Sequence, residues 1–146
     1  MTQLATRTPA SSADFLPSSF RVAALRGLRS CCPRCGGGAL FVRWLKPEAS
    51  CRACGQDWSH QRADDFPAYI AILVTGHLLA PVIIALVADF DLSPGAMAAI
   101  LLPLAVGLML GMLQPAKGAV IALQWWHGLH GFRRERREAP ARAEAP

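Results

Sequence analysis

The sequence predicts an α-helical membrane protein: a transmembrane hairpin of two helices, preceded by a small cysteine-rich domain with short β-strands and followed by an interfacial helix. Two observations lead to this fold class. Residues 66–88 and 92–113 contain no Asp, Glu, Lys or Arg, in a chain of 146 residues that is 53% hydrophobic and only 17% charged. Four of the five cysteines also form two Cys-x-x-Cys pairs. Long uncharged segments indicate membrane spans, and paired cysteines indicate a metal site.

The two ends of the chain have the composition of disordered segments. Residues 1–19 are rich in Ser, Thr, Ala and Pro and lack the apolar core of a secretory signal. Residues 133–146 alternate Arg, Glu, Ala and Pro in a similar way. We therefore expect a disordered leader and a disordered tail around an ordered centre.

The cysteines have the spacing of a structural zinc site. Both pairs continue with glycine, as "CPRCG" and "CRACG", so each predicts a tight turn that aims two thiolates at one point. A redox dithiol or an iron centre is the alternative, but no βαβ pattern surrounds the pairs. The predicted zinc ligands are Cys32, Cys35, Cys51 and Cys54.

The repeat leaves Cys31 without a counterpart, so we interpret it as a spare thiol. His60, six residues after the last cysteine, is interpreted as a surface residue. The apolar segment "ALFVRWL" at residues 39–45 predicts a strand. Residues 25–62 then form a zinc ribbon with Phe41, Trp44 and Trp58 in its core, and the metal supplies the folding free energy that so small a core lacks.

The predicted transmembrane helices cover about residues 66–88 and 94–113. Each would be roughly 30–35 Å long, enough to cross a hydrocarbon core of about 30 Å. Asp65 precedes the first helix, while Ser93 and Pro94 provide a cap and a first helical residue for the second. Two buried helices of a soluble core are the alternative, but so short a chain has little left to cover them.

Positive charge fixes the predicted orientation. The chain carries 15 Lys and Arg against 10 Asp and Glu, and all of the cations lie before residue 66 or after residue 113. The positive-inside rule places both termini in the cytoplasm and the short loop between the two helices outside. The lipid bilayer is then a partner, whereas nucleic acid is not needed to explain the charge.

His77 is predicted to lie about 16 Å inside the membrane, and Pro81 removes the helical partner of its carbonyl group. This pair is a candidate intramembrane polar site. The alternative is a kink with local hydrogen bonding. Gly107-x-x-x-Gly111 and the pair formed by Gly76 and Ala80 are close-packing motifs that could join the two helices or two copies of the chain in a homo-oligomer.

Pro115 should end or kink the second helix, which leaves an interfacial helix at about residues 116–131 on the cytoplasmic surface. Its tryptophans would lie in the aromatic belt of the membrane. The candidate interfacial residues are Lys117, Gln124, Trp125, Trp126, His127 and His130.

Three segments together resemble a bacterial family of small membrane proteins known as domain of unknown function 983: "LRGLRSCCPRCGGGALF", "CRACGQDWSHQRADDFPAYIAILVTGH" and "QPAKGAVIALQWWHGLHGF". They extend over roughly residues 25–132. The resemblance implies a membrane zinc-ribbon protein in which Cys31 is a local departure, since a polar or basic residue is usual there. Some members are associated with genes for haem–copper oxidase assembly.

The sequence features predict a non-enzymatic accessory or assembly protein whose cytoplasmic ribbon docks on a membrane protein. The resemblance implies a bacterial inner membrane as its location and a respiratory haem–copper oxidase or its assembly factors as the expected partner. A site of four cysteines leaves zinc no open position, which argues against catalysis. The alternative function is metal or haem handling by His77, His127 and His130.

Overall fold

The computed structural model describes residues 16–90 and 92–133. Most of the predicted disordered leader, residues 1–15, and the predicted tail from residue 134 onward lie outside the described residues. The elements, in chain order, are helix α1 (Phe20–Leu28), strand β1 (Phe41–Arg43), strand β2 (Lys46–Pro47), helix α2 (Phe66–Asp89), helix α3 (Pro94–His127) and a 3₁₀ turn, η1 (Leu129–Gly131).

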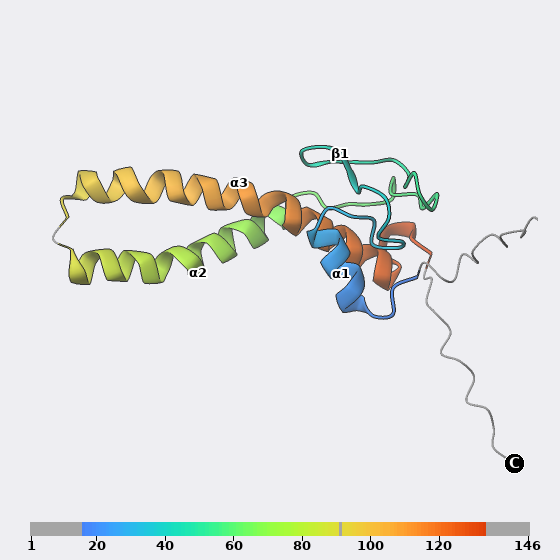
Figure 1. Ribbon diagram of the computed structural model, residues 1–146, viewed down its shortest axis with the longest axis horizontal. Helices are drawn as coiled ribbons and strands as arrows, with labels where there is room; N and C mark the ends of the chain where they lie inside the picture. The colour runs from blue at the N-terminus through green and yellow to red at the C-terminus, as the bar shows by residue number, and fades with distance from the viewer. Residues whose placement is uncertain (1–15, 91, 134–146) are drawn as a thin grey trace, which may run out of the picture.

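Helices α2 and α3 lie side by side and run in opposite directions, while the cysteine-rich domain lies beside the far end of α3 (Figure 1). Ser93 caps α3 as predicted, because its hydroxyl group accepts a hydrogen bond from the backbone N–H of Ala96 at 3.4 Å. Pro94 is the first residue of the helix, where a missing N–H costs nothing.

Both long helices are long and apolar enough to cross a membrane. Only 11% of the most apolar 18-residue segment of α2 is buried within the structure, and none of the corresponding segment of α3 is buried. A pair of core helices in a soluble protein would be covered by other elements, so that alternative does not fit. Insertion in a bilayer stays a prediction.

The prediction of a separate interfacial helix at residues 116–131 is wrong. Helix α3 continues through Pro115 to His127 and ends at Gly128, whose left-handed backbone (φ 67°) forms the C-cap. A proline inside a helix removes one backbone hydrogen bond. The residues after Pro115 make up for this loss by burying apolar side chains against the rest of the protein: Ala116, Val120, Ile121, Ala122 and Trp125.

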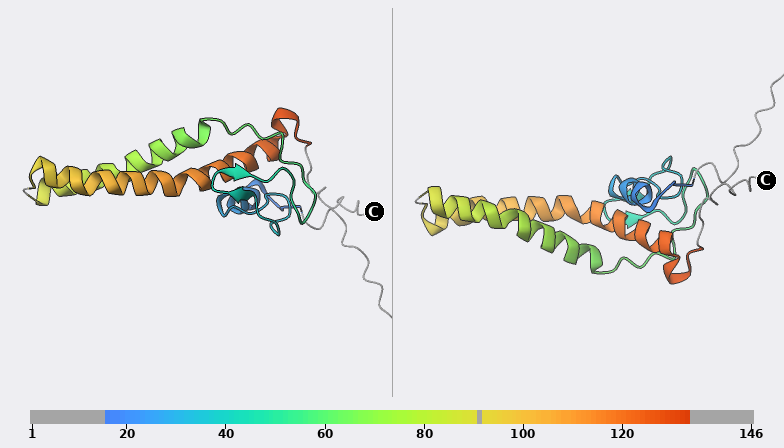
Figure 2. Two further views of the ribbon diagram at one scale, coloured as in Figure 1. Left: turned by 90° about the horizontal axis from the view of Figure 1, so that it is seen from above. Right: turned by 90° about the horizontal axis from the view of Figure 1, so that it is seen from below.

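The sequence predicts a disordered leader over residues 1–19 and a ribbon from residue 25, with no helix between or within them. Helix α1 is therefore an element that the sequence pattern missed. It packs against the C-terminal half of α3, which Figure 2 shows from two sides. The two backbones touch at glycines: a methyl group added to Gly27 would lie 2.3 Å from the carbonyl oxygen of Gly118. The close crossing is therefore between α1 and α3.

The predicted glycine motifs in the long helices make no such contact. A methyl group added at Gly76, Gly107 or Gly111 would meet nothing within 4 Å. These glycines do not join α2 to α3, and their role in a homo-oligomer stays a prediction.

The ribbon contains a two-stranded antiparallel sheet, in which Phe41 pairs with Pro47 and Arg43 with Lys46. Its core is continuous with α3. One cluster of buried side chains includes Leu40, Cys32, Cys51 and Trp58 from the ribbon, Val120, Ile121 and Trp125 from α3, and Phe132. The ribbon is thus built onto the helix and shares its core.

Of the three aromatic residues predicted for the ribbon core, Trp58 is 1% exposed and Phe41 is half-buried against the core cluster. Trp44 is 57% exposed, so its assignment to the core is wrong. It lies in the turn between β1 and β2, outside the shared core.

Candidate metal centre

The four cysteines predicted as ligands come together at one point. All four sulfur atoms lie within 4.8 Å of one another. The Sγ atoms of Cys32 and Cys54 are 3.8 Å apart, and those of Cys35 and Cys51 are 3.7 Å apart. A zinc–sulfur bond of about 2.3 Å requires sulfur atoms about 3.8 Å apart at the corners of a regular tetrahedron. The cluster therefore has the size and donor set of a tetrahedral zinc site.

The two Cys-x-x-Cys turns have the same backbone construction. The carbonyl oxygen of Cys32 accepts a hydrogen bond from Gly36 N–H, and that of Cys51 accepts one from Gly55 N–H, each at 2.8 Å. Both glycines have positive φ, 73° and 70°, as their place after each pair predicted. Each turn is also closed by an isolated antiparallel bridge: Cys31 with Ala39, and Ser50 with Asp57.

The surroundings of three of the thiols shift their pKa values, and not all in the same direction. Burial raises the pKa of the Cys32 thiol, and the other three thiols nearby raise it further. Burial also works against ionisation of Cys35, but hydrogen bonds from the backbone N–H groups of Gly37 and Gly38 and from neighbouring thiols outweigh it and lower its pKa to about 7. Burial raises the pKa of Cys54. Four thiolates so close together are stable only with a positive charge between them, which is what a zinc ion supplies.

Helix α1 braces the first turn. The Arg26 guanidinium group donates hydrogen bonds to the carbonyl oxygens of Arg34, at 2.8 Å, and Pro33, at 3.4 Å. The Arg34 guanidinium group in turn donates to the carbonyl oxygen of Cys54 at 3.5 Å. The two halves of the site are thus linked by the Arg34 side chain, in addition to the close approach of their sulfur atoms.

Cys31 is outside the cluster, as the repeat predicted. Its thiol is half-buried and lies 3.5 Å from the carbonyl oxygen of Arg29. His60 is exposed, in agreement with its surface assignment, and its imidazole lies 3.7 Å from the Asp57 carboxylate.

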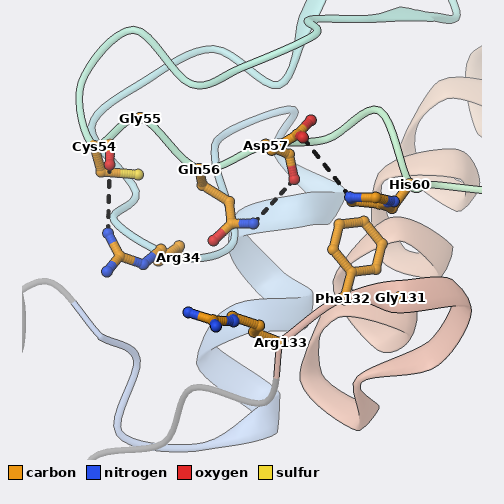
Figure 3. Close-up of a pocket in the computed structure, with 9 residues that line it drawn as sticks. All are labelled: Arg34, Cys54, Gly55, Gln56, Asp57, His60, Gly131, Phe132 and Arg133. Carbon is orange, nitrogen blue, oxygen red and sulfur yellow. Dashed lines mark hydrogen bonds and ion pairs between the residues drawn. The ribbon is translucent and has the colours of Figure 1, made fainter.

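His60 and Asp57 border a hollow of about 300 Å³ between the second Cys-x-x-Cys turn and the end of the described chain (Figure 3). The guanidinium groups of Arg34 and Arg133 also line it. A hydrogen bond from the backbone N–H of Ser59 to Asp57, at 2.8 Å, lowers the pKa of this exposed carboxyl group. The hollow is open, is lined by both polar and apolar groups, and includes Cys54 of the cysteine cluster in its wall.

Three of the candidate interfacial residues of α3 contact the ribbon: Lys117, Gln124 and Trp125. The Lys117 ammonium group donates to the carbonyl oxygen of Leu45 at 2.8 Å. The buried Gln124 side chain accepts from the backbone N–H of Arg62, at 3.0 Å, and donates to the carbonyl oxygen of the same residue. A polar helix face looks the same in sequence whether it meets water or another backbone, so the pattern alone could not reveal these contacts.

The two tryptophans of α3 have different surroundings. Trp125 is 1% exposed, and its ring packs edge-on to Trp58 with 6.3 Å between centroids. Trp126 is half-buried and packs against Phe20 of α1, at 6.2 Å. The assignment of Trp125 to an aromatic membrane belt is therefore wrong.

The histidines predicted for metal or haem handling do not form a site together. His77 is exposed on α2, where its Nδ1 atom lies 2.8 Å from the carbonyl oxygen of Leu73, one turn before it. Its imidazole therefore has a local hydrogen-bond partner in the backbone of its own helix. His127 packs against Phe20, and His130 is exposed in η1 with φ 56°. Within residues 16–90 and 92–133, no other group of three or more His, Cys, Asp and Glu side chains comes close enough to hold a metal ion.

Fold and site define a mostly helical protein with two long apolar helices, a two-stranded sheet and a four-cysteine cluster that could bind a metal ion. The family model described as "Protein of unknown function (DUF983)" matches residues 41–125, more than half of the chain. The chain therefore belongs to this family, which confirms the resemblance. The matched residues include Cys51 and Cys54 but begin after the first Cys-x-x-Cys turn. Comparisons with curated proteins and with solved structures find no match.

Proposed function

We propose that the protein is a non-enzymatic accessory protein of a bacterial inner membrane. Its two apolar helices cross the bilayer, both termini are cytoplasmic, and its zinc-braced ribbon is a docking module for a membrane-protein partner. One observation carries the proposal: α3 is a single helix that leads from the apolar segment directly into the core of the ribbon.

The contacts along α3 favour a docking surface that is held rigidly relative to this helix. Lys117 and Gln124 bind the ribbon backbone, and Trp125 fills its core. A domain fixed in this way keeps one height and one orientation above the membrane. Association then costs less conformational entropy than it would for a domain on a flexible linker.

The chemistry of the four cysteines supports a structural role for the metal. Four thiolates would complete the tetrahedral coordination of zinc, so no position would remain for a substrate or an activated water molecule. The metal would then hold the two Cys-x-x-Cys turns together.

The partner that we propose is a respiratory haem–copper oxidase or one of its assembly factors, on the strength of the resemblance described above. Affinity purification of the tagged full-length chain from native membranes, in mild detergent and after crosslinking, tests this proposal. We expect about one zinc ion per chain and a specific membrane complex in the eluate. The double variant Cys51→Ser/Cys54→Ser should lose both, whereas His77→Ala should keep both.

Recovery of the chain alone, in several detergents and after crosslinking, would overturn the docking function. Haem or copper bound in addition to zinc, and lost in His77→Ala, would favour the alternative of metal or haem handling. Recovery of the chain in the soluble fraction after lysis would contradict membrane insertion itself.

A further inference from the structure

The turn between β1 and β2 exposes an apolar surface flanked by cations. Trp44 and Val42 are 57% and 52% exposed, and the side chains of Arg43 and Lys46 beside them are exposed as well. Contiguous exposed apolar side chains rimmed by polar ones mark an interaction site in most soluble domains. The question is what this turn meets.

Two hydrogen bonds fix the height of this part of the ribbon along α3. Lys117 binds the carbonyl oxygen of Leu45, in the turn itself, at 2.8 Å. Gln114 donates to the hydroxyl group of Ser30, just after α1, at 3.0 Å. Gln114 and Lys117 are the first polar residues after the uncharged segment that ends at Leu113. The turn is therefore held at the level where the apolar part of α3 ends.

Helix α2 begins at the same level. It has 24 residues and runs antiparallel to α3 from the loop that joins them. Equal helical rise therefore places Phe66 opposite about Lys117. Phe66 and Tyr69 are both exposed, as Trp44 is. Aromatic residues at one level beside apolar helices are typical of a membrane–water interface.

The end of α1 contributes to the same edge of the ribbon. Leu28 and Arg29 are exposed and directly precede Ser30, which is bound to Gln114. The membrane-facing edge, as we name it, thus combines apolar side chains with three cations. Its members are Leu28, Arg29, Val42, Arg43, Trp44 and Lys46.

We propose that the membrane-facing edge rests in the headgroup layer of an anionic bilayer, with Trp44 inserted below the phosphates and the cations paired with lipid phosphates. Two observations favour lipid over a protein as the occupant. The edge continues the exposed apolar surface of α2 and α3, and its cations complement the negative surface of the cytoplasmic leaflet. The inference rests on the membrane insertion proposed above.

Depth-dependent quenching of tryptophan fluorescence tests the proposal. The zinc-loaded full-length chain is placed in lipid nanodiscs that contain phosphatidylglycerol and acyl chains brominated near the headgroup. We expect Trp44→Phe to lose more than half of the quenching seen in the unsubstituted chain. Trp126→Phe is the matched control and should lose little. Trp126 lies nine residues beyond Lys117, or about 14 Å further along α3.

Single-charge variants test the contribution of the lipid headgroups. Lys46→Gln should reduce the quenching of Trp44 in anionic discs and have a smaller effect in phosphatidylcholine discs. Arg62→Gln also removes one exposed cation, but at the residue whose backbone is bound by Gln124, further along α3 from the turn, so it should leave the quenching unchanged.

Quenching in Trp44→Phe equal to that of the unsubstituted chain would overturn the inference and leave the turn as a surface for a protein partner. A chain that inserts in the discs with Trp44 unquenched overturns only this inference. A chain that does not enter the discs at all overturns membrane insertion, and the inference with it.

Discussion

At the scale of single residues, the spacing of the cysteines determines which thiols can share one metal ion. The four sulfur atoms of the cluster lie within 4.8 Å of one another, and burial raises the pKa of the Cys32 thiol. Without a cation, the Cys32 thiol therefore stays protonated at neutral pH, and the two turns are held together only weakly. With zinc, all four become thiolates and the turns are linked by four bonds.

This difference predicts opposite outcomes for two neighbouring substitutions. Cys32→Ser removes a buried ligand, so we expect its zinc content to fall from about one ion per chain to well below half and its ribbon to unfold. Cys31→Ser changes a thiol outside the cluster and should keep its zinc. Metal analysis of the two purified variants, with near-ultraviolet circular dichroism of the buried tryptophans, checks the prediction.

Equal zinc loss in both variants would mean that Cys31 takes part in binding. Equal retention would mean that three cysteines suffice.

At the scale of the elements, the crossing of α1 and α3 depends on two glycines. A methyl group at Gly27 would lie 2.3 Å from the carbonyl oxygen of Gly118, and one at Gly118 would lie 2.0 Å from that of Gly27. Both neighbours are backbone atoms, which cannot move without displacing a helix. We therefore expect Gly118→Ala to destabilise the ribbon by about 1–3 kcal/mol, as overpacking of a core does.

Gly107→Ala is the matched control, since it changes the same residue type in the same helix but has nothing within 4 Å. It should be neutral or slightly stabilising, because alanine favours a helix by about 1 kcal/mol over glycine. Urea unfolding in detergent micelles, followed by tryptophan fluorescence, measures both free energies. A Gly118→Ala variant as stable as Gly107→Ala would show that α1 is not held against α3 at this point.

The elements that the sequence predicted well are those with a strong local signal. The uncharged runs predicted α2 and the apolar part of α3, Ser93 predicted the cap, and the spacing of the cysteines predicted all members of the cluster. The failures share one cause. The end of the second helix at Pro115, the missing α1 and the position of Trp125 all depend on packing between distant segments, which overrides local propensity.

At the scale of the whole molecule, the ribbon and the far half of α3 form one folding unit. Val120, Ile121 and Trp125 belong to one buried cluster with Leu40, Trp58, Cys32 and Cys51 of the ribbon. A helical segment of about a dozen residues is marginal in water without such packing. The metal should therefore support α3 beyond Pro115 as well as the ribbon that binds it.

Removal of zinc by a strong chelator should expose this unit to hydrogen exchange. In nanodiscs, we expect amides of residues 30–62 and 116–127 to exchange at least about tenfold faster, because each tenfold corresponds to about 1.4 kcal/mol of lost protection and loss of a structural metal removes more than that. Residues 66–89 and 94–113 should keep their protection, because lipid would shield their hydrogen bonds in the membrane-inserted state that we propose. Chelator saturated with zinc is the control. Faster exchange in residues 30–62 alone would show that α3 beyond Pro115 is stable without the folded ribbon. The ribbon and this part of α3 would then unfold independently.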